Sequence, residues 1–386
     1  MEIKQKKILI VTGEASGDHH GALVVKALKH ISPDIQVAGI GGEELEKAGM
    51  ELLYHSRNLS VVGFSEVLSR ASHILTAYRV LKKEILTRRP DLVMFIDYPE
   101  FNLLIAAIAK KHHVPVLYYI SPQIWAWRQG RAKKIARLVT KMAVIFPFEV
   151  PFYQKFGLDV SFVGHPLLDQ EINVMPRSAA LKTFNFTDDG PIIGLLPGSR
   201  PSEIVRLLDP MLGAAEIIKK NFPSVQFILP LAQGISQDFV QRLIHQKKIQ
   251  ITMVTNSFYA ALDTCDLVLV ASGTATLQTA LMGKPMIILY KVALLTYVIG
   301  RVLIRIPWIG LANIVAGKKV VPELIQDDIT AEKIAGEACA LLKDPERMQR
   351  IKTELSTIKK TLGEKGASTR VAQMIDEMIN PKKYIL

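Results

Sequence analysis

A single carboxylate at the end of an apolar run is the first sign of chemistry in this sequence. Asp97 follows the run LVMFI in the segment IDYPEFN at 96–102, and a proline comes two residues later. A carboxylate fixed at the end of a buried strand is well placed to act as a general base. The alternative is that Asp97 or Asn102 caps the helix that follows. We therefore predict Asp97 as a candidate catalytic base.

The segment LLPGSRPSEI at 195–204 has the form of an anion site, because an apolar run leads directly into a helix start. The N–H groups around Gly198 and Ser199 can receive a negatively charged group at such a start. Arg200 adds a guanidinium that can hold a phosphate through two parallel hydrogen bonds. These three residues predict a phosphate-binding turn.

The segment LVLVASGTATLQ at 267–278 has the same form. Ser272, Gly273 and Thr274 place small side chains and N–H groups at another helix start. Gln278 lies one turn further along, on the same helix face as Thr274. No Gly-Lys-Ser/Thr sequence follows the glycine, so this is no Walker loop. We predict that the turn contributes to the same anion site.

A glycine-rich turn, GEASGDHHG at 13–21, follows the first apolar run. Its spacing is not G-x-G-x-x-G, which disfavours a dinucleotide. A loop of this kind can present backbone N–H groups to a substrate. The alternative is a tight turn whose helix is capped by Ser16 or Asp18. The predicted site loop comprises Gly13, Glu14, Ser16, Gly17 and Asp18.

Two of the three tryptophans lie close together in SPQIWAWRQGR at 121–131. Tryptophan usually belongs to a core or an interface, and that is one interpretation of Trp125 and Trp127. The other is that an indole face receives a sugar. Under the second interpretation, the candidate acceptor contacts are Asn102, Gln123, Trp125, Trp127 and Arg128.

No metal or cofactor is expected from the sequence. The histidine pairs His19–His20 and His112–His113 consist of adjacent residues, whose side chains diverge on a helix or strand. No cluster of His, Asp or Glu has the spacing of metal ligands. Two cysteines in the chain cannot build a disulfide framework, which suits a reducing cytoplasm.

Continuous apolar runs alternate with helical periodicity in both halves of the 386-residue chain. This alternation is typical of parallel, doubly wound sheets. We predict an α/β protein with two facing Rossmann-like domains and a cleft between them. The expected divisions are 1–165, 166–360 and a helical tail at 361–386.

Together these features fit a sugar donor that carries a nucleoside diphosphate. The candidate base belongs to the first domain, and Arg200 with both helix starts belongs to the second. The base would deprotonate an acceptor hydroxyl. Arg200 and the helix starts would stabilise the diphosphate leaving group in place of a metal.

The net charge of +12, from 48 basic and 36 acidic residues, predicts an anionic partner such as lipid or a phosphorylated substrate. No nucleic-acid motif accompanies the charge, so nucleic acid is not expected. The most apolar region, 292–317, is interrupted by Arg301, Arg305 and Pro307 before it could span a bilayer. The apolar run near the N-terminus is too short for a signal peptide.

The motifs, in their order, resemble those of the lipid-A-disaccharide synthases through nearly the whole chain. They are GEASGD, D-x-P-x-FN, SPQIWAWRQGR, FPFE, VGHPL, LLPGSR, ASGTATL and LANIVAGKKVVPELIQ. The resemblance implies a metal-independent inverting glycosyltransferase of the two-Rossmann-domain type, called GT-B. It would transfer 2,3-diacylglucosamine from its UDP derivative to 2,3-diacylglucosamine 1-phosphate. The expected product is a β-1′,6-linked disaccharide of lipid A biosynthesis.

The resemblance also implies roles for particular residues. Asp97 matches the family's essential aspartate and Arg200 its essential arginine, while Asn313 and Glu323 match donor-side positions. Gln278 stands where the family most often has glutamate, and an amide gives a weaker hydrogen bond than a carboxylate. Dimers that exchange C-terminal segments are a further family property.

A diacylated substrate implies a cytoplasmic enzyme held at the inner face of the inner membrane. An apolar stripe with basic neighbours in 61–83 is a candidate for membrane contact. An ordinary core-facing amphipathic helix is the alternative. The membrane interpretation singles out Val61, Val62, Phe64, Leu68 and Arg70.

Two other functions remain open at this point. A UDP-sugar 2-epimerase could have the same architecture, with several catalytic carboxylates and a histidine. A non-catalytic protein could bind anionic lipid through its positive charge. Neither alternative would depend on Asp97 as the base for an acceptor hydroxyl.

Overall fold

The computed structural model describes residues 5–59, 67–127, 129–170, 175–293, 297 and 306–381. The chain divides into two compact units. The first unit comprises residues 1–170 together with 362–386, and the second comprises 171–361.

The first unit is built on a seven-stranded sheet in the order β3-β2-β1-β4-β5-β6-β7, and every strand pair is parallel. Its strands are β1 (Lys7–Thr12), β2 (Gln36–Gly41), β3 (Glu51–His55), β4 (Leu92–Ile96), β5 (Val116–Tyr119), β6 (Lys141–Val144) and β7 (Asp159–Phe162). Its α-helices are α1 (Ala15–Ile31), α2 (Glu43–Lys47), α3 (Val67–Thr87), α4 (Pro99–Lys111), α5 (Ile124–Trp127), α6 (Ala132–Leu138), α7 (Glu149–Gln154) and α17 (Ala367–Ile379). Short 3-10 helices are η1 (Ser56–Asn58), η3 (Gln129–Arg131) and η4 (Pro166–Leu168).

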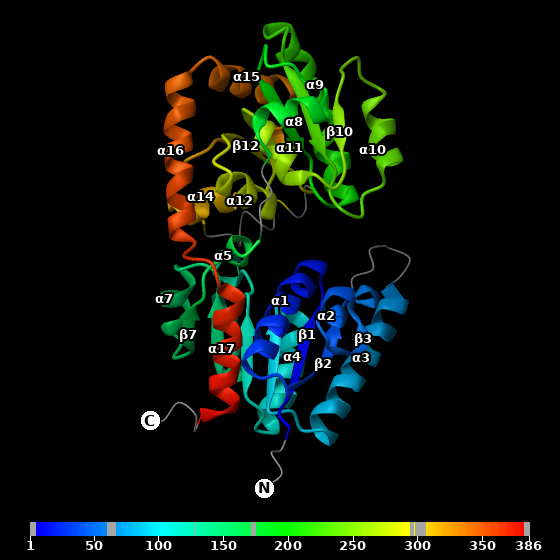
Figure 1. The fold of residues 1–386 in the computed structure, drawn as a ribbon, viewed down its shortest axis with the longest axis vertical. Coiled ribbons are helices and arrows are strands. Elements are labelled where there is room, and N and C mark those ends of the chain that lie inside the picture. Colours follow the sequence, from blue (N-terminus) through cyan, green and yellow to red (C-terminus); the bar gives the residue numbers. More distant parts are fainter. Residues whose placement is uncertain are drawn as a thin grey trace. The chain divides into compact units, whose positions relative to one another are not determined.

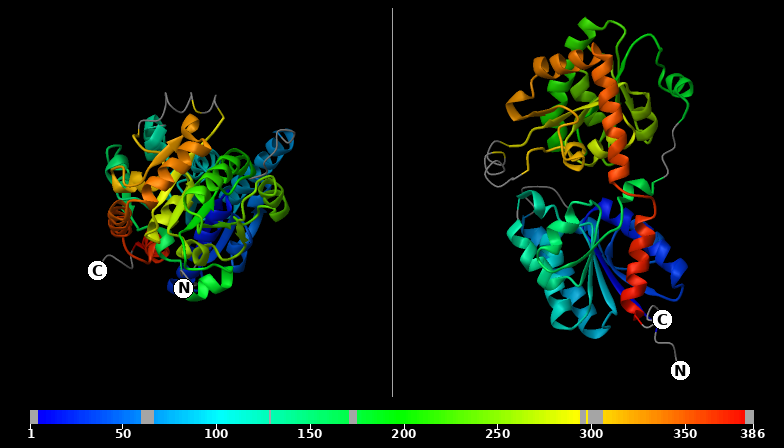
Figure 2. Two further views of the ribbon diagram at one scale, coloured as in Figure 1. Left: turned by 90° about the horizontal axis from the view of Figure 1, so that it is seen from above. Right: turned by 90° about the vertical axis from the view of Figure 1, so that its left-hand side faces the viewer.

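Both faces of this sheet are covered, which explains why its central strands β4 and β5 are buried at every position. Alternate strand residues such as Leu9, Val93 and Tyr118 pack with apolar residues of α3, α4 and α6 in one core. Helices α1 and α17 lie on the opposite face (Figure 2). The turns that follow β1, β4 and β5 therefore meet at the carboxyl edge of the sheet.

The segment 361–386, expected as a helical tail, contributes α17, which packs along α1 (Figure 1). The carboxylate of Asp169 accepts hydrogen bonds from the N–H groups of Gly366, Ala367 and Ser368, at 2.6, 3.3 and 3.1 Å. Ser32 Oγ donates to the buried carboxylate of Asp376 in α17 at 2.8 Å. These bonds fix the last helix to the first unit.

The second unit has a six-stranded parallel sheet in the order β10-β9-β8-β11-β12-β13. Its strands are β8 (Ile192–Leu196), β9 (Gln226–Pro230), β10 (Thr252–Val254), β11 (Leu267–Ala271), β12 (Met286–Tyr290) and β13 (Glu323–Ile325). Its helices are α8 (Arg177–Phe184), α9 (Pro201–Asn221), α10 (Gln237–Ile244), α11 (Phe258–Thr264), α12 (Thr274–Leu281), α14 (Leu311–Ala316), α15 (Ala331–Leu342), α16 (Pro345–Thr361) and the 3-10 helix η5 (Gln326–Asp328). Helix α9 packs on α15, and α12 packs on α14 and α16.

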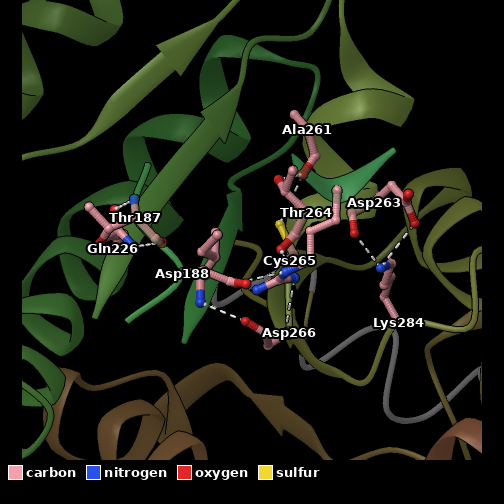
Figure 3. A network of polar contacts seen from close by, with 11 residues as sticks. Thr187, Asp188, Gln226, Ala261, Asp263, Thr264, Cys265, Asp266 and Lys284 are labelled. Carbon is pink, nitrogen blue, oxygen red and sulfur yellow. Dashed lines mark hydrogen bonds and ion pairs between the residues drawn. The ribbon is translucent and has the colours of Figure 1, made fainter. Parts of the chain in front are cut away.

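Charged side chains tie together the amino edge of this second sheet (Figure 3). Asp266, just before β11, accepts a hydrogen bond from the N–H of Ile192 at the start of β8, at 2.9 Å. Arg177 of α8 donates to Asp188 and to the carbonyl of Thr264, both at 3.1 Å. The network lies at the sheet edge opposite to the predicted phosphate turns and has a structural role.

The prediction of two α/β units with parallel sheets is confirmed. Two edge strands, β3 and β13, are not predicted from the sequence. Strand β3 is only half-buried and β13 has three residues, so neither has the continuous apolar run of a central strand. Within the described residues, no helix is long and apolar enough to cross a membrane.

Candidate functional site

Asp97 lies in a strained turn at the carboxyl edge of the first sheet. Asp97 and Tyr98 both adopt left-handed backbone conformations, with φ of 45° and 48°. For residues other than glycine, such a conformation costs about 1–3 kcal/mol each. The carbonyl of Asp97 accepts two hydrogen bonds at 2.6 Å, from the Tyr118 hydroxyl and the Asn102 amide. These bonds hold the turn, so the fully buried Asn102 supports the backbone of Asp97 and is not exposed to an acceptor.

The surroundings of Asp97 suit a general base. Burial first, and then the nearby charge of Glu14, raise the pKa of Asp97 to about 6. Glu14 is close because β1 and β4 are neighbours, with Thr12 in register with Ile96. A carboxylate with this pKa is ionised at neutral pH and is a stronger base than an ordinary aspartate.

The glycine-rich turn fits against the Asp97 turn. A Cβ atom on Gly13 would lie 2.4 Å from Cγ of the Tyr98 ring, so only glycine allows this approach. Glu14 and Ser16 are exposed at the same edge, and Gly17 packs against Thr12. The first unit thus brings the predicted loop and the predicted base together.

Asp18 does not belong to the exposed part of this loop. Its buried carboxylate accepts hydrogen bonds from the N–H groups of Gly42 and Glu44, at 2.5 and 3.0 Å, and so caps α2. The alternative prediction, that Ser16 or Asp18 caps α1, is wrong, because Glu14 is the N-cap residue there and its side chain makes no capping hydrogen bond.

Trp125 lies in the interior, as the core interpretation predicts. Its side chain is 6% exposed and its Nε1–H donates to the carboxylate of Glu149 at 3.1 Å. Gln123 is exposed nearby, whereas Arg128 and the side chain of Trp127 lie outside the described residues. Glu149 was not predicted as a site residue, although the motif FPFE contains it.

The second unit contains a cavity of about 730 Å³ at the carboxyl edge of its sheet. Tyr259, Asn256 and Gln233 line it and are not predicted from the sequence, since neither the start of α11 (Tyr259) nor the loops of the other two residues has a phosphate-binding pattern. Seven predicted donor-side residues also line it: Gly198, Ser199, Arg200, Ser272, Gly273, Thr274 and Gln278.

The start of α9 is not the open anion cradle that the sequence predicts. The carboxylate of Glu203 accepts hydrogen bonds from the N–H groups of Ser199 and Arg200, at 3.0 and 3.3 Å. A Cβ atom on Gly198, whose φ is 122°, would lie 2.4 Å from that carboxylate. The Arg200 side chain is 70% exposed and lies 3.6 Å from Glu203, so it remains accessible to a ligand.

The start of α12 is more open to an anion. N–H groups in the first turn of a helix have no acceptor within that helix, and here Thr274 and Ala275 line the cavity. Ser272 Oγ donates to the carbonyl of Ile309 at 3.1 Å and fixes the turn. Gln278 Nε2 donates to the Tyr259 hydroxyl at 2.9 Å. An ionised glutamate at this position has no donor and could only accept a hydrogen bond from that hydroxyl.

Asn313 and Glu323 hold a neighbouring loop and lie outside the cavity lining. Glu323 accepts hydrogen bonds from the N–H groups of Ile309 and Gly310, both at 3.0 Å, and from the Asn313 amide at 2.8 Å. The buried Asn313 in turn accepts from the N–H of Val320 at 2.8 Å. Glu323 is connected to the cavity through Ile309, whose N–H donates to Glu323 and whose carbonyl accepts from the cavity residue Ser272.

The described part of the chain contains no group of three or more His, Cys, Asp or Glu side chains that could hold a metal ion. Val61, Val62 and Phe64, predicted for membrane contact, lie outside the described residues. Leu68 and Arg70 belong to α3, but their side chains are also outside them.

Residues 8–378 match the family model for lipid-A-disaccharide synthetase. The chain belongs to the lipid-A-disaccharide synthetase family. A lipid-A-disaccharide synthase of Geobacter metallireducens is 47% identical over 378 residues, which cover 98% of each chain. One from Coxiella burnetii is 42% identical over 377 residues, covering 98% of this chain and 100% of the other. The family and its glycosyltransferase activity are thus supported over the full length.

Solved structures show the same fold in more distant proteins. The UDP-GlcNAc 2-epimerase of Neisseria meningitidis, bound to UDP-GlcNAc, has a TM-score of 0.64 at 12% identity and covers 96% of this chain and 99% of its own. MurG of Acinetobacter baumannii has a TM-score of 0.59 at 16% identity, with coverage of 97% and 99%. At these identities the likeness shows the fold alone.

The charge of Glu14 gives the first testable expectation for this family member. Replacing Glu14 by glutamine removes the neighbouring negative charge, so the pKa of Asp97 falls. Because the base must be ionised, the acidic limb of kcat/KM should move to lower pH. A pH–rate profile measures this, with Glu46→Gln, an exposed carboxylate on α2, as the control. An acidic limb at the same pH in Glu14→Gln and wild type would contradict the assignment.

Proposed function

We propose that this chain joins 2,3-diacylglucosamine from a UDP donor to 2,3-diacylglucosamine 1-phosphate (lipid X). The products are a β-1′,6-linked lipid A disaccharide 1-phosphate and UDP. The observation that carries the proposal is the family match over residues 8–378. Each unit supplies one half of the necessary chemistry.

The first unit supplies the base. The Asp97 carboxylate takes the proton of the acceptor's 6-hydroxyl, and the hydroxyl oxygen then attacks the anomeric carbon of the donor sugar. The bond from that carbon to the UDP oxygen breaks, with inversion at the carbon. A partly buried carboxylate of raised pKa, on a turn fixed by Tyr118 and Asn102, supports this role.

The second unit supplies the donor site. Its cavity of about 730 Å³ has the volume of a typical small-molecule site. The exposed guanidinium of Arg200 and the first-turn N–H groups of α12 offer positive charge to the diphosphate. Gln278 and Tyr259 form a polar pair on the cavity wall that suits the nucleoside. As UDP leaves, the same groups stabilise its growing charge.

The alternative functions explain fewer observations. An epimerase of Neisseria meningitidis and a putative one of Listeria monocytogenes have a similar fold but are only 12% and 13% identical to this chain, whereas lipid-A-disaccharide synthases are 41–48% identical. A non-catalytic lipid-binding protein gives no role to a partly buried carboxylate of raised pKa in a strained turn.

Replacing Asp97 by asparagine should lower disaccharide formation roughly a thousandfold, because a general base typically contributes 10²–10⁴-fold. UDP affinity should stay at the wild-type value, since Asp97 belongs to the first unit. The measurement supplies both labelled diacylglucosamine substrates and follows the disaccharide 1-phosphate and UDP. Asp159→Asn, an exposed carboxylate of the first unit, is the control. Formation of no product by the wild type would refute the proposed function.

Replacing Arg200 by alanine should weaken the donor site. We expect the donor KM to rise about tenfold, in line with the loss of one charge-assisted contact. The acceptor KM should not change. Arg242→Ala, an exposed arginine on α10, provides the comparison. Equal UDP affinity in Arg200→Ala and wild type would remove Arg200 from the diphosphate site.

We further propose contact with an anionic membrane surface. On α3, Leu75 is 45% exposed and Arg79 and Lys82 are exposed one and two turns later. Leu75→Ser should therefore reduce sedimentation with anionic liposomes. The matched control is Val205→Ser, because Val205 is 59% exposed on α9 in the second unit. Similar losses in both variants would argue against a membrane face on α3.

Dimerisation through exchanged C-terminal segments is also part of the proposal. In such a dimer, the partner's α17 would replace the contact between α1 and α17 that one chain makes with itself. Sedimentation velocity distinguishes a dimer from a monomer.

A further inference from the structure

Glu149 is a buried carboxylate with three hydrogen-bond donors around it. Its side chain is 1% exposed at the start of α7. One carboxylate oxygen accepts from Ser121 Oγ at 2.5 Å and from Trp125 Nε1 at 3.1 Å. The other accepts from the N–H of Phe146 at 3.0 Å. The carboxylate thus joins two loops, the tryptophan segment (121–127) after β5 and the turn after β6.

The donor set explains why a carboxylate stands at this position. The indole N–H of Trp125 and the backbone N–H of Phe146 can only donate, so both need an acceptor. No ion pair involving Glu149 is found among the described residues. Burying a carboxylate without a cation is costly, and an apolar side chain would leave two buried donors unpaired. The site therefore favours a group that accepts on both oxygens.

Aromatic contacts reinforce the same connection between the two loops. The ring of Trp125 meets Phe148 edge-on with centroids 4.9 Å apart, and Phe148 stacks on Phe146 at 5.3 Å. The Tyr153 hydroxyl of α7 donates to the carbonyl of Pro122 at 3.3 Å. The tryptophan segment is thus held from the side of α7.

The tryptophan segment begins beside the Asp97 turn. Strands β4 and β5 are paired, with Ile96 in register with Tyr119, and the N–H of Asp97 donates to the Tyr119 carbonyl at 3.3 Å. Ser121 comes two residues after that carbonyl. Any displacement of this segment therefore changes the surface next to the base, where Gln123 is exposed.

We propose that Glu149 is a positioning residue for the acceptor substrate. It fixes the tryptophan segment so that the segment forms one wall of the acceptor site next to Asp97. The inference rests on the proposed function, since it takes the Asp97 edge as the acceptor site. Glu149 itself does not touch the substrate and acts through Ser121 and Trp125.

Glutamine at position 149 tests this geometry because it is isosteric but carries one NH₂ group. If the NH₂ faces Phe146, it meets a backbone N–H. If it faces Trp125, it meets the indole N–H. One obligate donor is unpaired in either orientation. We expect Glu149→Gln to raise the acceptor KM about tenfold, as for an unpaired buried donor, and to leave the donor KM unchanged.

A second substitution should remove the conflict. In Trp125→Phe/Glu149→Gln the indole N–H is gone, and the NH₂ can donate to Ser121 Oγ. Ser121 can then donate to the carbonyl of Pro122, which already lies 3.3 Å from it. The acceptor KM of the double variant should therefore equal that of Trp125→Phe alone. If Glu149→Gln instead acts through a general structural defect, the effects of the two substitutions on the acceptor KM should add in the double variant.

Two controls keep the test decisive. Asp376→Asn changes another buried carboxylate of the first unit, on α17, and reports general destabilisation. Ser121→Ala serves as the test variant if Glu149→Gln does not fold. It removes one of the three donors and should raise the acceptor KM about threefold.

An unchanged acceptor KM, equal changes in donor and acceptor KM as in Asp376→Asn, or additive losses in the double variant would each overturn this proposal while the wild type stays active. A wild type that forms no disaccharide would overturn the proposed function, and this inference with it.

Discussion

The two hydrogen bonds on the carbonyl of Asp97 are the constraint on which the first unit's site depends. A left-handed turn of two non-glycine residues is unfavourable by itself, and Tyr118 and Asn102 make it the preferred state. The turn directs Tyr98 onto Gly13, so the glycine-rich loop is shaped by the same pair of bonds. Because Tyr118 belongs to β5, the turn is also coupled to the strand that leads into the tryptophan segment.

The second unit uses two similar strand-to-helix turns in different ways. At the start of α9 the protein's own Glu203 accepts from the N–H groups of Ser199 and Arg200, and the exposed Arg200 side chain remains accessible to a ligand. At the start of α12 no such internal carboxylate is bonded among the described residues, and the first-turn residues line the cavity. The same motif therefore supplies a side-chain cation in one turn and a helix dipole in the other.

Much of the fold follows from patterns that the sequence displays directly. Strands covered on both faces must be apolar throughout, and this predicts the central strands of both sheets. Asp97 and the turns at Gly198 and Gly273 are predictable because parallel strands place their carboxyl ends at one edge. Edge strands such as β3 lack that pattern, since one side of the strand has no neighbour.

Side-chain partners are what the sequence does not reveal. Glu14 and Asp18 are four residues apart at the start of α1, yet Asp18 caps α2 and Glu14 faces the edge with Asp97. The resemblance predicts that Glu323 contacts the sugar donor, whereas its carboxylate accepts hydrogen bonds from the backbone N–H groups of Ile309 and Gly310. Each outcome depends on which donors the tertiary fold brings near, and these partners are distant in sequence.

The discontinuous first unit has a consequence for the order of assembly during synthesis. All of the second unit lies within 171–361, so its contacts are available before the last helix is made. The first unit includes 362–386, and α1 has no α17 to pack against until residues 367–379 have been made. Nascent domains fold as units once their residues have emerged. The unit that begins the chain is therefore completed after the second one, and a ribosome that stops before α17 releases a chain with a complete second unit and an incomplete first unit.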